Sequence, residues 1–151
     1  MSEDEDAIFL QARRELTNKI NNYFKELSEE YQVPPPKWEW STMPWYHSAI
    51  ALIGLKTNII FIGDYLIGYY VVDPSLCWTI VKWTCAHEFC HYLQNLEGKP
   101  ISNLLAEIKA NEFATTKTKM SKNEQDILFQ KLVNKFVVSS WNDRKERALR
   151  R

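Results

Sequence analysis

The spacing of apolar and polar residues predicts a long helix near the start of the chain. Apolar residues recur every three or four positions from Ala7 to about Tyr31, and charged residues occupy the opposite side. Three consecutive prolines at 34–36 follow, and they cannot continue a helix. Residues 1–6 are acidic, and we expect them to be a disordered N-terminus ahead of this helix.

The middle of the chain predicts a small sheet. Aromatic and polar residues alternate over 37–41, as in a strand with one buried face. Two apolar runs, 48–55 and 58–62, are separated by two polar residues and predict a hairpin, with Gly63-Asp64 as the next turn. A short run at 69–72 is rich in aromatic and β-branched residues and is a further candidate strand.

Capping residues predict two helices after the sheet. Asp73 can cap a helix that has Pro74 in its first turn, and Gly98 marks where that helix stops. Ser102 can cap the next helix, over 103–117.

A last helix is predicted to follow the capping box at 121–124. Its expected buried stripe consists of Ile127, Leu128, Leu132, Phe136 and Val137. The order of elements predicts an α+β fold, with residues 7–142 as a single domain and 143–151 as a basic C-terminal tail.

Composition narrows the function classes. The 151 residues include 19 basic and 19 acidic side chains, so the net charge is zero and we expect neither membrane association nor direct nucleic-acid binding. The basic tail leaves a contact with DNA as a lesser alternative. The chain starts with acidic residues and has three cysteines, so we expect reduced thiols and a cytoplasmic location.

A His-Glu-x-x-His pattern lies inside the helix predicted after Asp73. On a helix, His87 and His91 are one turn apart on the same face, so both imidazoles can reach one metal ion. Glu88 is rotated by about 100° from His87, so it lies beside the ion and can act as a base. The pattern predicts a Zn²⁺ site with His87 and His91 as ligands and Glu88 as the catalytic residue.

A catalytic zinc site needs a third protein ligand. The carboxylates after the helix are Glu97, Glu107 and Glu112. Glu97 lies at the helix end and would have to bend back to reach the ion, whereas Glu107 lies in the middle of a helix that can fold back antiparallel. We therefore predict Glu107 as the third ligand. Asn111 follows one turn later and is a candidate for a hydrogen bond to a ligand such as His87.

Two segments resemble the ImmA/IrrE family of metallopeptidases. Residues 83–91, Trp-Thr-Cys-Ala-His-Glu-Phe-Cys-His, resemble the family's metal helix. Residues 107–114, Glu-Ile-Lys-Ala-Asn-Glu-Phe-Ala, resemble its second motif, in which Ala-Asn-x-Phe-Ala follows the ligand Glu. The chain departs from the family at Cys90, where a small residue is usual, and at 115–117, where an apolar ending is usual.

The resemblance implies a zincin-like fold of the gluzincin type and a zinc-dependent endopeptidase. It also implies a protein or peptide substrate, such as a separate helix-turn-helix repressor in a phage or mobile-element setting. The alternative is a zinc-containing regulatory protein of the same fold that binds its partner without cleaving it.

Other polar residues are open alternatives for the site. Cys85 and Cys90 are expected to be core thiols, because a helix turns them away from the face that carries the two histidines. His47 is expected to be a sheet-edge histidine, with a fourth metal ligand or an oxyanion donor as the alternative. Four tyrosines could donate to a developing oxyanion; they are Tyr46, Tyr65, Tyr69 and Tyr70.

Overall fold

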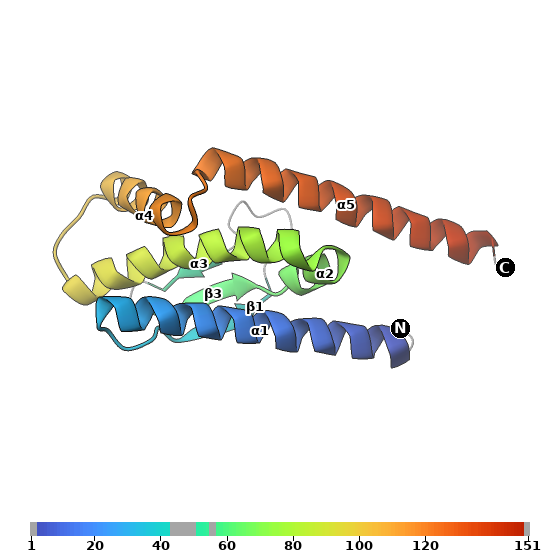
Figure 1. Ribbon diagram of the computed structural model, residues 1–151, viewed down its shortest axis with the longest axis horizontal. Helices are drawn as coiled ribbons and strands as arrows, with labels where there is room; N and C mark the ends of the chain where they lie inside the picture. Colours follow the sequence, from blue (N-terminus) through green and yellow to red (C-terminus); the bar gives the residue numbers. More distant parts are fainter. Residues whose placement is uncertain (1–2, 43–50, 55–56, 150–151) are drawn as a thin grey trace.

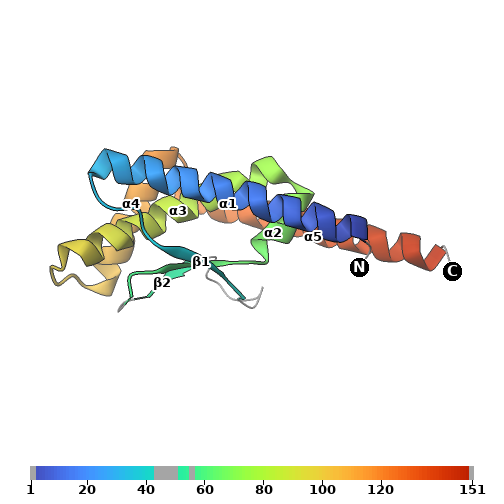
Figure 2. The ribbon, with the colours of Figure 1, turned by 90° about the horizontal axis from the view of Figure 1, so that it is seen from below.

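The fold is a layer of helices over one face of a small sheet. The computed structural model describes residues 3–42, 51–54 and 57–149. These residues form five helices and one three-stranded sheet, which confirms the α+β class. The helices all lie on the same side of the sheet (Figure 2). Among the described helices, none combines the length and the apolar content needed to cross a lipid bilayer.

Helix α1 (Glu3–Tyr31) and strand β1 (Trp38–Ser41) pack against each other. The helix begins at Glu3, so residues 3–6 form its first turn and not the disordered end that was predicted. The indole nitrogen of Trp38 donates to Asn21 Oδ1 at 2.7 Å, and that of Trp40 donates to Thr17 Oγ1 at 3.0 Å. These two bonds fix one edge of the sheet to the helical layer.

Strand β3 (Ile60–Gly63) is the centre of the sheet, whose order is β1-β3-β2. It pairs in parallel with β1 and antiparallel with β2 (Ala51–Ile53). The predicted hairpin is therefore confirmed over the described residues, while 43–50 and 55–56 lie outside them. Ile60 and Ile62 are buried on the face that the helices cover, and β2 is left at the sheet edge.

Helix α2 (Leu66–Val72) replaces the strand predicted at 69–72. The aromatic and β-branched composition of this segment favours a strand. The helix forms instead because Leu66, Ile67, Tyr69 and Tyr70 are all buried. In a helix these four residues lie on one broad face, whereas a strand would divide them between its two faces. Such burial overrides intrinsic propensity.

Helix α3 (Pro74–Glu97) runs through the centre of the molecule, between α1 and α5 (Figure 1). Its predicted ends are confirmed: Asp73 Oδ1 accepts a hydrogen bond from Leu76 N at 3.1 Å, and Gly98 has a left-handed φ of 70°. Eleven of its residues are buried, so the helix is apolar on several faces, as expected for one enclosed by other elements. The His-Glu-x-x-His segment therefore lies on a helix that other elements enclose.

Helices α4 (Asn103–Thr118) and α5 (Lys122–Leu149) complete the fold, and both predicted N-caps are present. Ser102 Oγ accepts from Leu105 N at 3.2 Å, and Ser121 Oγ accepts from Glu124 N at 3.1 Å.

The predicted stripe of α5 is only partly right. Leu132 is buried and both Leu128 and Phe136 pack against the core, as predicted, but Ile127 and Val137 are 60% and 59% exposed. The side of α5 that faces the core also carries Gln125 and Phe129, which were not predicted. The helix also continues through most of the segment predicted as a tail, to Leu149.

The turn after α3 yields a prediction on stability. Gly98→Ala should lower the free energy of unfolding by about 1–2 kcal/mol, because a Cβ is disfavoured at positive φ. Gly68→Ala in α2 is the matched control and should raise it by about 0.5–1 kcal/mol, since its new Cβ would lie 3.5 Å from the Phe136 ring, an ordinary contact. Urea unfolding of both variants measures the difference, and effects of the same sign would contradict this account of the turn.

Candidate metal centre

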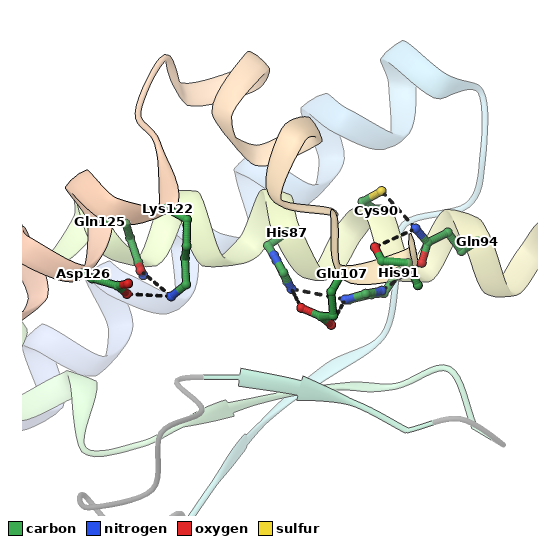
Figure 3. A network of polar contacts seen from close by, with 9 residues as sticks. His87, Cys90, His91, Gln94, Glu107, Lys122, Gln125 and Asp126 are labelled. Carbon is green, nitrogen blue, oxygen red and sulfur yellow. Dashed lines mark hydrogen bonds and ion pairs between the residues drawn. The ribbon is translucent and has the colours of Figure 1, made fainter. Parts of the chain in front are cut away.

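Helices α3 and α4 bring together two histidines and a carboxylate (Figure 3). His87 Nε2 and His91 Nε2 lie 3.2 Å apart, one helical turn from each other on α3. Glu107, on α4, places its Oε2 at 3.3 Å from His87 Nε2 and its Oε1 at 2.8 Å from His91 Nε2. The chain returns antiparallel after Gly98, so the three residues predicted as ligands meet at one point.

The geometry of this group suits a metal ion. One donor atom from each residue lies within 4.8 Å of the other two. Ligands about 2.0–2.1 Å from a tetrahedral ion are roughly 3.3 Å from one another, and the N–N and N–O distances of 2.8–3.3 Å are close to that spacing. His87, His91 and Glu107 can therefore hold a metal ion.

Burial keeps the His87 imidazole in the neutral form that can bind a metal ion. The side chains of His87 and His91 are only 12% and 13% exposed, whereas Glu107 is 57% exposed. Burial lowers the pKa of the His87 imidazole well below its ordinary value, and the neighbouring His91 lowers it further. His87 is thus neutral at neutral pH, with a lone pair available for a metal. The Trp83 ring stacks on His87 with centroids 5.4 Å apart, which restricts the imidazole to one orientation.

Gln94 orients His91, a role that the sequence did not reveal. Its Nε2 donates to the carbonyl of Ala106 at 3.2 Å, which leaves Oε1 to face His91 Nδ1 at 2.9 Å. An amide oxygen can only accept, so Nδ1 carries the proton and Nε2 keeps its lone pair for a metal. Because Ala106 precedes Glu107, one side chain joins the positions of two ligands. Spacing alone could not have separated Gln94 from Asn95, its neighbour on the helix.

Asn111 lies beside His87, as predicted. Asn111 raises the pKa of His87, which places the amide close to the ring. Asn111 Oδ1 and His87 Nδ1 are nevertheless buried without a partner among the described residues. Asn111 Oδ1 is an acceptor and His87 Nδ1 can be a donor, so the two atoms are complementary.

A cleft of about 400 Å³ adjoins the metal group. All of β2, Ala51–Ile53, lines it opposite α3, and helix α4 contributes Glu107. Glu88 of α3 also faces this cleft, as do Lys122 and Gln125 of α5. The donor group, the predicted base and the edge strand of the sheet therefore share one cavity.

Glu88 is a buried carboxyl group in this cleft. It is 6% exposed and makes no hydrogen bond with any residue that the structure describes. Burial raises the pKa of the Glu88 carboxyl to about 8, and the charge of Glu107 adds to the rise. Such a group is costly to bury, and strongly perturbed carboxyls in clefts are concentrated at functional sites.

The remaining candidates are not brought to the metal group. Cys85 and Cys90 are buried thiols outside it, as predicted. Glu97 pairs with Lys99 at 2.9 Å, and Glu112 is exposed on α4.

Three of the four candidate tyrosines also lie away from the cleft. Tyr65 and Tyr69 line a separate cavity beside α5, and Tyr70 donates to Glu15 Oε2. His47 and Tyr46 fall outside the described residues.

The Gln94 contacts lead to a prediction on metal affinity. Gln94→Leu should weaken zinc binding about 10–100-fold, the usual cost of losing an outer hydrogen-bond partner of a ligand. Gln94→Glu, which keeps an acceptor for His91 Nδ1, should retain most of the affinity. Competition with a chromophoric chelator measures the affinity for zinc. Gln130→Leu, an exposed change on α5, is the control. Unchanged affinity in Gln94→Leu would contradict the assigned role.

Comparison with known proteins does not assign the chain to a family. No protein-family model matches the chain, and no curated protein has a significantly similar sequence.

Proposed function

We propose that the chain is a zinc-dependent endopeptidase with a zincin-like fold of the gluzincin type. His87, His91 and Glu107 would hold Zn²⁺, and Glu88 would act as the general base. The donor set supports zinc, since two imidazoles and one carboxylate with an open position are typical of catalytic zinc sites. The ordered pair of motifs that resembles the ImmA/IrrE family supports the same proposal.

The strongest support for a hydrolytic site is the position of Glu88. A buried carboxyl group without a hydrogen-bond partner among the described residues faces the same cleft as the three donors. A purely structural metal site gains nothing from such a group, which only adds a desolvation cost. A hydrolytic site needs a base beside the ion, and Glu88 is the residue that we propose for this role.

The residues around the cleft would divide the chemistry among them. When bound, zinc supplies Lewis acidity, which acidifies water and polarises a carbonyl group. Glu88 becomes a carboxylate at neutral pH once positive charge is bound nearby, because an adjacent cation lowers its raised pKa. Its carboxylate then accepts the proton of the attacking water and transfers it to the nitrogen of the departing amine. Gln94 holds the tautomer of His91 throughout.

Strand β2 is the element suited to align a substrate. It is an edge strand, and its residues line the cleft opposite α3. An extended peptide could add to this edge through main-chain hydrogen bonds and so lie beside the metal group. The substrate we propose is a cytoplasmic regulatory protein, such as a separate helix-turn-helix repressor, which follows from the family resemblance.

Glu88→Gln tests the peptidase proposal directly. The amide is similar in size but cannot accept a proton, so cleavage should fall at least about 100-fold while zinc content stays at that of the wild type. Peptide hydrolysis is followed by mass spectrometry and zinc by elemental analysis. Glu112→Gln, an exposed change on α4, is the control for both.

The same variant separates the proposal from its alternative. If the chain regulates its partner by binding alone, with zinc as a structural element, Glu88→Gln would inactivate that partner as well as the wild type does. That result would refute the peptidase.

A further inference from the structure

Lys122 is a fixed positive charge in the cleft. Among the described residues that line the cleft it is the one lysine or arginine, while Glu88 and Glu107 are the carboxyl groups. Its side chain is 49% exposed, and its Nζ lies 5.4 Å from the centre of the Trp83 ring, which in turn stacks on His87. The ammonium group is therefore next to the metal group without belonging to it.

A buried amide fixes the position of this ammonium group. Lys122 Nζ donates to Gln125 Oε1 at 3.1 Å, and Gln125 Nε2 donates to Thr84 Oγ1 at 3.2 Å. Thr84 Oγ1 donates in turn to the carbonyl of Ile80 at 3.1 Å. Gln125 is 1% exposed, so a fully buried polar side chain links α3 to α5.

An ordinary surface ion pair does not account for this arrangement. Lys122 also donates to Asp126 Oδ1 at 2.7 Å, one turn further along α5. Such an exposed pair is worth only about 0.3–0.5 kcal/mol and needs no buried amide to support it. An ammonium group has three donors, and Gln125 and Asp126 occupy two of them. The third has no side-chain acceptor among the described residues, and because Lys122 lines the cleft it can donate to an anion there.

We propose that Lys122 is a carboxylate-binding subsite that sets the substrate preference of the cleft. This inference rests on the proposed peptidase function. In a peptide, a carboxylate comes either from an Asp or Glu side chain or from the free C-terminus. Figure 3 shows Lys122 set to one side of the three donor residues along α3. The subsite would thus select a group beside the cleaved bond and would not contact the reacting carbonyl.

Cleavage of two peptide libraries tests the subsite and identifies the source of the carboxylate. The zinc-loaded chain is given random nonapeptides with both ends blocked, and the same peptides with a free carboxyl end. Enrichment of Asp or Glu at one fixed position in the blocked library would indicate a side chain. Cleavage at a fixed distance from the free carboxyl end, and only in the second library, would indicate the C-terminus.

Variants of Lys122 then assign the preference to this residue. Lys122→Met should lower the ratio of kcat/KM for acidic over neutral peptides by about tenfold, the effect of one hydrogen bond to a charged group. Lys122→Arg should retain most of the preference. Lys131→Met, an exposed change on the same helix, should leave the ratio unchanged. A wild type without carboxylate preference, or a preference that survives in Lys122→Met, would overturn the subsite.

A peptide-binding experiment tests the carboxylate subsite independently of the proposed hydrolysis. The zinc-loaded Glu88→Gln variant is incubated with the same libraries, and the retained peptides are identified by mass spectrometry. If the wild type cleaves nothing but acidic peptides are retained through Lys122, hydrolysis fails and the subsite stands. If the wild type cleaves peptides without carboxylate preference, hydrolysis stands and the subsite fails. If nothing is cleaved and nothing is retained, both are refuted.

Discussion

The packing of α4 against α3 is the contact on which the candidate site depends. It places the Glu107 carboxylate within 3.3 Å of two imidazole nitrogens that the helix already holds one turn apart. The histidines need only helical geometry, but the carboxylate needs the turn at Gly98 and the side chain of Gln94 to arrive at the same point. Metal binding would in turn stabilise this packing, since a site formed only in the folded chain adds its binding energy to folding.

Buried polar groups on α3 and α5 show where the fold departs from simple apolar packing. Glu88, Thr84 and Gln125 are all more than 90% buried, and all three line one cleft. Thr84 and Gln125 satisfy each other across two helices, whereas Glu88 has no such partner among the described residues. Burying polar groups costs desolvation energy, and proteins usually keep such groups where function needs them. These groups are the reason that we place the proposed function in this cleft.

Much of the fold could be predicted because its helix ends are encoded locally. Asp73, Gly98, Ser102 and Ser121 act within a few residues of their own position, and all four occupy the predicted capping roles. The segment at 69–72 could not be predicted in this way, because its helical form depends on burial by distant elements. The parallel pairing of β1 with β3 is likewise a long-range feature that local patterning does not encode.

The residues of the site also fall into a group that local sequence predicts and a group that depends on long-range contacts. His87, Glu88 and His91 share one helix, so their spacing carries the prediction, and Glu107 required only that the next helix fold back. Gln94 and Lys122 were missed. Gln94 bonds the Ala106 carbonyl of α4, and Lys122 lies over the Trp83 ring of α3. These contacts between helices appear only in three dimensions.

X-ray absorption at the zinc edge of the purified, zinc-loaded chain tests the central claim most directly. The account predicts a first shell of nitrogen and oxygen at about 2.0–2.1 Å with the scattering of two imidazoles, and Glu107→Ala should change that shell. A sulfur ligand at about 2.3 Å, or a spectrum that Glu107→Ala leaves unaltered, would contradict it.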